Sequence, residues 1–306
     1  MTATAVKPVV EPPIKPSLRL RLAERGIDMR LLLLVPSVVV VLVLFVYPFI
    51  FGIQLSLTPQ RFNNPFDNYR AFFSDPYYFS SLSNTLAIAV PATFVNVFAA
   101  VPIAVRMRHA FRGRRLLAAA LVVPVSLGTV FLADGMLNVL GPAGWLNKAL
   151  IGIGLIDDPI RLTNNWWGVF LSLVVSGFPF AFLLMLAYAS GIDPSLESAA
   201  ATLGASRGQR FRYVIFPLLL PGAAVTLCLN FVMAFSVFPS AVLLGDPSGS
   251  SRVLALIAYQ EAQERLDPSM GSAVAMLLAA AQLVFVVLVL GARSLLYRGP
   301  ATGGKG

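Results

Sequence analysis

Long apolar runs alternate with short polar segments along most of the chain. A helix needs about 20 apolar residues to cross the roughly 30 Å hydrocarbon core of a bilayer, because each residue adds about 1.5 Å to its length. The runs that reach this length are residues 31–53, 82–105, 116–140, 165–190, 217–244 and 269–292. The pattern therefore predicts an all-α, polytopic membrane protein with six transmembrane helices.

The composition supports this fold class and limits the chemistry. Of the 306 residues, 57% are hydrophobic and 12% are charged, whereas a soluble domain carries about 25% charged residues. One cysteine (Cys228) and one histidine (His109) provide no set of metal ligands, and no nucleophile–base arrangement is visible. We therefore expect no metal, no cofactor and no enzymatic activity in this chain.

The lysine and arginine residues lie mostly on one side of the predicted spans. Segments 1–30, 106–115, 191–216 and 293–306 together hold 17 of the 23 basic residues. Cytoplasmic segments of membrane proteins carry such an excess, so both termini are predicted to be cytoplasmic. Topology then accounts for the net charge of +9, and we expect no nucleic-acid partner.

The polar segment between the fourth and fifth spans has the signals of a folded, helical loop. Asp193 and Pro194 are favoured at the start of a helix, and Gly204 is favoured at its end. Ser206 and Gln209 have the spacing of a capping box, which predicts a second helix. Three consecutive alanines give the first helix a thin face that another protein can approach closely. We interpret the segment as a rigid docking element.

The same segment resembles the EAA motif of permease subunits in binding-protein-dependent ATP-binding-cassette (ABC) importers. That motif reads Glu-Ala-Ala, three residues, Gly, nine residues, Ile, one residue and Leu-Pro. Aligned on the glycine, its positions here are Ser198, Ala199, Ala200, Gly204, Val214, Phe216 and Pro217. Ser198 departs from the family glutamate. Glu197 replaces that glutamate only in part, because one residue is about 100° around a helix.

The resemblance extends over residues 80–291 and implies a fold, a function and a set of partners. It implies a type I ABC importer fold in a bacterial inner membrane, with residues 193–217 as a cytoplasmic loop coupled to an ATPase. The implied partners are two ATPase subunits that bind ATP and magnesium, a second and similar permease subunit, an external solute-binding protein and membrane lipid. ATP hydrolysis is then expected outside this chain.

The predicted spans and the extent of the resemblance together divide the chain into four parts. Residues 1–30 are predicted to be a cytoplasmic tail, in which 19–30 have the pattern of a basic amphipathic helix or of a flexible flank. Residues 31–79 contain the first transmembrane helix and an outer loop. Residues 80–291 are predicted to form the type 1 permease core, and 292–306 a second cytoplasmic tail.

The sequence defines the cargo less closely than the fold. Residues 238–263 and 270–276 resemble the spermidine/putrescine group of these permeases, which implies a polyamine-like cation. A sugar or a sugar derivative is the alternative, because the sugar-permease group is nearly as similar. An ion-coupled secondary transporter is a further alternative, although such proteins usually show internal repeats or broken helices around charged residues at the membrane centre.

Polar side chains within the predicted spans are candidates for the substrate pathway, because they are costly in a membrane and often functional. These candidates are Asp134, Asn138, Asn230, Ser236 and Gln282. Asp134 is the only carboxylate within the predicted spans, so it is suited to attract a cation. The alternative role of such residues is contact with a partner subunit.

Overall fold

The computed structural model describes residues 34–61, 63–108 and 113–296, and within these residues every regular element is helical. The predicted amphipathic segment 19–30 lies outside the described residues, as does most of the predicted tail 292–306. The chain divides into two compact units, Met1–Gly52 and Ile53–Gly306.

The described part of the first unit belongs to one apolar helix. It consists of α3 (Val35–Val41), a π-helical turn η1 (Leu42–Val46) and α4 (Tyr47–Ser56), whose last residues fall in the second unit. In η1 the Tyr47 N–H donates to the Leu42 carbonyl five residues back, just before Pro48. Proline has no N–H and its ring clashes with the carbonyl four residues back, so a wider turn relieves the conflict.

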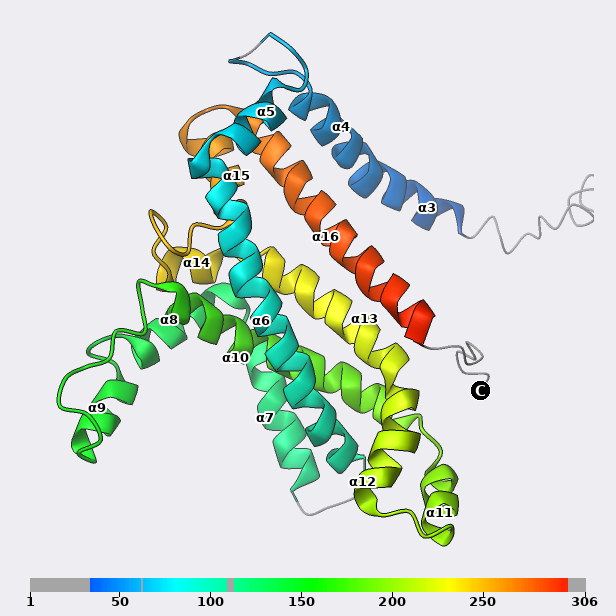
Figure 1. The fold of residues 1–306 in the computed structure, drawn as a ribbon. Coiled ribbons are helices and arrows are strands. Elements are labelled where there is room, and N and C mark those ends of the chain that lie inside the picture. The colour runs from blue at the N-terminus through cyan, green and yellow to red at the C-terminus, as the bar shows by residue number, and fades with distance from the viewer. Residues whose placement is uncertain (1–33, 62, 109–112, 297–306) are drawn as a thin grey trace, which may run out of the picture. The chain divides into compact units, whose positions relative to one another are not determined.

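The second unit is built on packed apolar helices. The long helices α6 (Pro76–Met107), α10 (Trp166–Ser190) and α13 (Phe216–Phe235) contact one another, and α16 (Pro268–Leu296) packs on α13. Figure 1 shows these helices running through the unit. Burial along α6, α10 and α13 is uneven, since the face that meets neighbouring helices is buried while the other face stays exposed, and α16 is buried only near its start. This is the expected division between protein-facing and lipid-facing residues.

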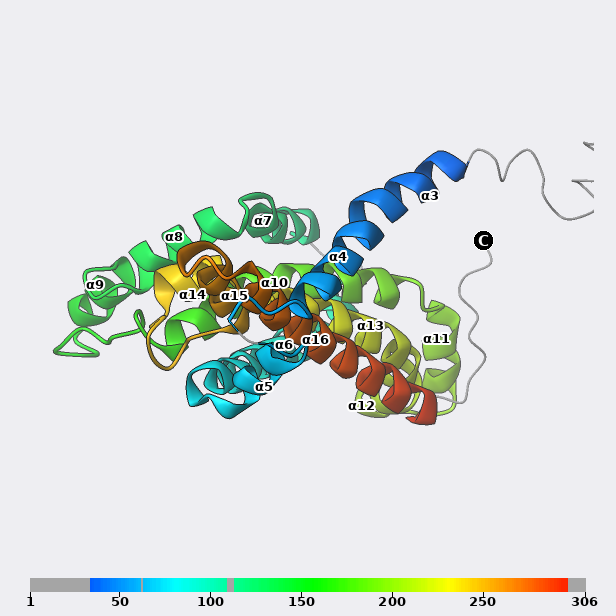
Figure 2. The same cartoon turned by 90° about the horizontal axis from the view of Figure 1, so that it is seen from above.

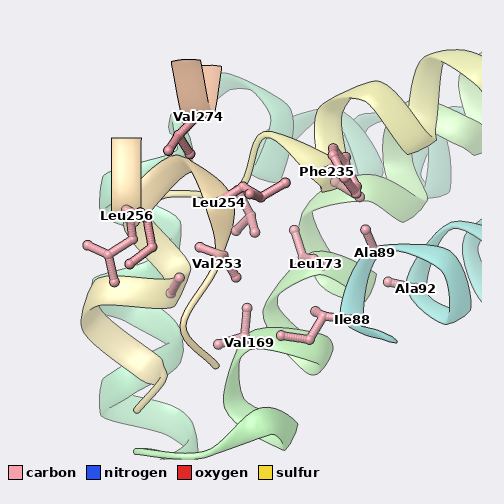
Figure 3. Close-up of a cluster of buried hydrophobic side chains, with 14 of the residues drawn as sticks. Ile88, Ala89, Ala92, Val169, Leu173, Phe235, Val253, Leu254, Leu256 and Val274 are labelled. Atoms are coloured by element: carbon pink, nitrogen blue, oxygen red, sulfur yellow. The ribbon is translucent and has the colours of Figure 1, made fainter. Parts of the chain in front are cut away.

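A cluster of buried side chains fills the space between these helices, as Figure 3 shows. Ala89 and Ala92 of α6 lie opposite Val169 and Leu173 of α10, and Phe235 of α13 adjoins them. Small residues such as these alanines let helix backbones approach closely, which is how helices gain packing contacts inside a membrane.

Short helices complete the second unit. They are α5 (Asp67–Ser74), α7 (Arg114–Ser126), α8 (Thr129–Leu140), α9 (Trp145–Gly152), α11 (Pro194–Thr202), α12 (Arg207–Arg210), η2 (Phe211–Ile215), α14 (Pro239–Leu244), α15 (Leu254–Tyr259) and η3 (Gln260–Glu264). Within this unit α11 and α12 lie at the end opposite α5 and α15 (Figure 1), and α9 projects at one side in both views (Figure 2).

The all-α membrane fold is confirmed, but two of the predicted spans differ from the helices in the structure. Within the described residues, five helices are long and apolar enough to cross a membrane. The predicted span 116–140 is instead α7 and α8, broken at Gly128, whose φ of 75° lies in the region that favours glycine. The predicted span 217–244 stops at Phe235, because Pro239 starts a new helix and biases the residue before it away from helical geometry.

A buried acid fastens the loops at the α5–α15 end of the second unit. Glu261 is fully buried, and its Oε1 accepts hydrogen bonds from Tyr78 at 2.9 Å and from Arg265 at 2.5 Å. Asp267 is paired with Arg61 at 2.9 Å. A buried carboxylate is tolerated only with such partners, and these contacts tie the start of α6 to the turn before α16.

Candidate coupling loop and substrate cleft

The coupling loop, residues 193–217, begins with the predicted helix start. Asp193 is the N-cap of α11, and its Oδ1 accepts a hydrogen bond of 2.8 Å from the Ser195 N–H. The same backbone hydrogen bond holds the pKa of the Asp193 carboxyl below its usual range. The cap is therefore intact above the unfolded pKa of aspartate and is lost as the pH falls through the lowered folded value.

The first helix of the loop ends at Gly204 in a two-bond Schellman motif. The Gly204 N–H donates to Ala201 and the Ala205 N–H donates to Ala200, both at 3.0 Å, with Gly204 at a φ of 82°. Ser206 and Gln209 then form the predicted capping box, with hydrogen bonds of 3.3 and 2.8 Å. The predicted order of helix, glycine and second helix is confirmed.

A π-helical turn joins the loop to the membrane span. In η2 the Phe216 N–H donates to the Phe211 carbonyl five residues back, and Pro217 follows at once. The cause is the one that applies at Pro48, since proline cannot continue regular α-helical hydrogen bonding. Val214 lies within this turn, and Phe216 and Pro217 are the first two residues of α13, so the last three matched positions of the motif lie where η2 joins α13.

Apolar side chains of the coupling loop are exposed. Leu203 is 89% exposed and Tyr213 is 70% exposed, and Ala199 lies on the exposed side of α11. Ser198, at the motif glutamate position, is exposed and its hydroxyl donates to the Pro194 carbonyl at 3.2 Å. Ser198 therefore satisfies its hydroxyl within its own helix and brings no charge to the surface, whereas Leu203 offers apolar area for a partner.

Glu197 faces the inside of the chain. Its carboxylate accepts a hydrogen bond from Arg108 at the end of α6, and its Oε1 lies 3.9 Å from Arg210 Nη1. The Arg108 side chain is only 5% exposed. In the sequence, Arg108 is one of the basic residues of segment 106–115. A basic residue where α6 leaves the membrane suggests an acidic partner nearby. The sequence does not indicate which one, because Glu197 is 89 residues away.

Two of the predicted pathway residues line a cleft of about 200 Å³. The cleft lies beside the α7–α8 break, between α10 and α13. Its lining residues are Pro124, Gly128, Thr129, Leu132, Leu173, Ser176, Gly177, Phe180, Asn230, Met233, Ala234, Ser236, Val237, Phe238, Pro239 and Ser240. Asn230 and Ser236 come from the candidate set, and the lining contains hydroxyls, an amide and aromatic rings but no ionisable side chain.

The polar residues of the cleft are held by hydrogen bonds to neighbouring helices. Asn230 Oδ1 accepts a hydrogen bond of 3.1 Å from Asn96 of α6, and Asn230 Nδ2 donates to the Gly177 carbonyl of α10 at 2.9 Å. Gln282 of α16 donates to the Ser236 hydroxyl at 2.7 Å. Gln282 therefore supports the cleft from outside its lining. These contacts fix the orientation of the amide and hydroxyl groups.

Asp134 and Asn138 lie apart from the cleft lining. Both are exposed on α8, and the Asn138 amide donates to the Asp134 carbonyl at 3.0 Å. The structure thus brings Asn230, Ser236 and Gln282 together and leaves the single carboxylate of the candidate set outside that group. Sequence reasoning missed Asn96, whose polar side chain in the predicted span 82–105 was the available signal.

The bundle of apolar helices, the uncharged cleft and the capped helical loop at 193–217 are features of a multi-pass membrane permease. Residues 89–298 match the family described as the binding-protein-dependent transport system inner membrane component, and the chain belongs to this family. It is therefore a non-catalytic transmembrane subunit without a cofactor, and ATP is bound by ATPase subunits.

Other permeases resemble this chain in sequence, and solved structures resemble it in fold. The chain is 28% identical over 271 residues to a "Probable ABC transporter permease protein" of Brucella suis biovar 1, covering 84% of this chain and 93% of the relative. It is 32% identical over 182 residues to the spermidine/putrescine permease PotB of Escherichia coli K12, covering 58% of this chain and 65% of that relative. A bacterial alginate ABC transporter in complex with an alginate-bound periplasmic protein gives a TM-score of 0.77 at 20% identity, covering 91% of this chain and 99% of that one.

Proposed function

We propose that the coupling loop of this permease docks onto an ATPase subunit and passes the motion of that subunit to the membrane spans. One observation carries the proposal: the loop is a pair of capped helices, the second of which continues without interruption into α13. A rigid element of this kind transmits displacement, which a flexible linker does not. Leu203 and Tyr213 provide exposed apolar area for the contact.

The complete importer, on this proposal, has two ATPase subunits that bind ATP and magnesium, a second and similar permease subunit and an external solute-binding protein. The solved alginate transporter, which has the same permease fold and includes a periplasmic protein, supports the last of these partners. The excess of basic residues supports a bacterial inner membrane topology with both termini and the coupling loop in the cytoplasm.

The mechanism follows from the linkage between ligands and conformations. ATP binding closes the ATPase pair, the coupling loop moves with it, and the spans alternate between outward and inward access. Each ligand must bind one of the two states more tightly in order to shift the balance between them. ATP and the solute-loaded binding protein favour the outward-open state, and release of hydrolysis products returns the inward-open state.

Leu203→Glu tests the docking surface. Because the side chain is 89% exposed, the variant should fold normally, yet a buried charge at the contact should weaken ATPase binding by roughly tenfold or more. The measurement is co-purification of the ATPase subunits with the tagged permease. Leu155→Glu is the matched control, since Leu155 is 69% exposed in a predicted outer loop. Equal ATPase recovery from both variants would contradict the proposal, as would transport without any ATPase.

For the cargo we propose a polyamine-like cation, and the supporting observation is the 32% identity to the spermidine/putrescine permease. A second candidate, a neutral hydroxyl-rich solute such as a sugar, is favoured by the chemistry of the cleft. Its lining has Thr129, Ser176, Asn230, Ser236 and Ser240 for hydrogen bonding and no carboxylate to balance a cation. Desolvating a cation without an opposing charge is costly.

Calorimetry on the external binding protein of this importer separates the two cargo proposals. Spermidine and putrescine are titrated in one series and neutral sugars in the other. The first proposal expects heat from the amines alone, with saturation of a single site. Heat from a sugar and none from either amine would overturn it and support the second proposal.

A further inference from the structure

Three charged residues from different parts of the second unit meet beside the coupling loop. We call Arg108, Glu197 and Arg210 the Glu197 cluster. Glu197 accepts a hydrogen bond from Arg108 and lies 3.9 Å from Arg210 Nη1. The Arg108 side chain is 5% exposed, and those of Glu197 and Arg210 are 23% and 21% exposed. At such low exposure the pairs are shielded from the solvent screening that weakens surface ion pairs.

The cluster connects α11 to two membrane spans. Arg108 is the C-cap residue of α6, so its bond to Glu197 fixes α11 to the end of that span. Arg210 is the last residue of α12, which continues through η2 into α13. One carboxylate in the first turn of α11 therefore faces the ends of both helices.

The same two spans are joined again within the membrane. Asn96 of α6 donates to Asn230 of α13 at 3.1 Å, and Asn96 also donates to the Leu173 carbonyl of α10 at 3.1 Å. Both asparagines are buried. Two polar links at separate levels resist rotation of one helix against the other, which a single link does not.

We propose that Glu197 and Arg108 are positioning residues that hold α11 and the ends of α6 and α13 together as one moving body. The inference rests on the proposed function, in which the coupling loop carries motion from the ATPase. It adds that the motion reaches α6 through the Arg108–Glu197 pair, in addition to reaching α13 through the continuous helix. Glu197 thus acts inside the chain, while Ser198 occupies the motif position on the exposed face.

Spin-label distances test the link without any knowledge of the cargo. Cys228 is the only cysteine, so Cys228→Ser gives a background for labels at Ser195→Cys in α11 and Arg106→Cys at the end of α6, both exposed positions. The full chain in lipid nanodiscs should give one narrow distance, unchanged when ATPase subunits and ATP are added. Arg108→Gln or Glu197→Gln should broaden it, while Arg108→Lys and the control Arg207→Gln should keep it narrow.

Coupling between hydrolysis and transport supplies the second readout. In the assembled importer, Arg108→Gln should lower the amount of solute moved per ATP hydrolysed roughly five- to tenfold, at the lower end of the usual range of coupling effects. Arg108→Lys should restore most of the ratio, which a loss of folding would not allow. A narrow Arg108→Gln distance with an unchanged ratio would overturn the proposal. Docking itself is judged separately by Leu203→Glu, so the two proposals can fail independently.

Discussion

Replacing Gly168 with alanine is expected to remove most of the folded permease from the membrane. Gly168 lies in the first turn of α10, and a Cβ atom there would sit 2.5 Å from the Leu244 carbonyl oxygen and 2.7 Å from that of Leu162. Both obstructing atoms belong to the backbone, so no side-chain rotation relieves the overlap. Overpacking of this kind costs about 1–3 kcal/mol of folding stability. We expect a cost at the upper end of this range, because the backbone itself must move.

Gly135→Ala provides the control for Gly168→Ala. Gly135 is inside α8, and nothing lies within 4 Å of its added Cβ. Alanine in an open helical position gains about 0.5–1 kcal/mol over glycine. Thermal unfolding followed by fluorescence size-exclusion should therefore move down by several degrees for Gly168→Ala and slightly up for Gly135→Ala. A fall of equal size in both variants would contradict the assigned contact at Leu244.

Gly204→Val should abolish transport while leaving the membrane fold intact. The φ of Gly204 is 82°, and a left-handed conformation costs an L-residue roughly 1–2 kcal/mol, with β-branched valine among the worst. The residue is exposed, with nothing within 4 Å of an added Cβ. The strain is therefore confined to the turn, which must open and tilt α11 away from α12. We expect ATP-driven uptake in proteoliposomes to fall more than roughly tenfold, because a misplacement of about 1 Å or more breaks docking.

Two controls isolate the backbone conformation as the cause. Gly204→Asn should retain most of the uptake, because asparagine tolerates left-handed geometry. Gly208→Val places the same side chain four residues away, at a helical glycine with open space around its Cβ, and should cost little. Loss of uptake in all three variants, or in none, would show that the turn at Gly204 is not the determinant.

The sequence predicts the coupling loop well because its signals are local. Asp193, Gly204 and Ser206 each act on backbone groups within five residues of themselves, so their types and spacing are enough to place both helices. The helix break at Gly128 escaped prediction because the segments on both sides of it are mostly apolar. Hydrophobicity shows that a segment can be buried in lipid or protein, but it does not show where the helix breaks.

The candidate site required contacts that no local pattern encodes. Arg108 and Glu197 meet across 89 positions, and Asn96 and Asn230 across 134. Counting polar residues in spans found Asn230 and Ser236, because a polar group in a membrane is conspicuous at any position. It grouped Asp134 with them because a list of polar residues contains no information on which face of α8 a residue occupies.

The π-helical turn before Pro217 has a consequence for rotation. Each residue of an α-helix turns the chain by about 100°, and a π turn takes up one extra residue in the same helix. The turn at Phe211–Ile215 therefore sets the angle between the docking face of the coupling loop and the packed face of α13. Removing one residue from the π turn would return it to a regular α-helical turn with little rotation, whereas removing one residue from the α-helical part of this connection would point the loop about 100° away from its partner. The number of residues between Gly204 and Pro217 thus fixes the rotation of the coupling loop about the helix axis as well as its distance from α13.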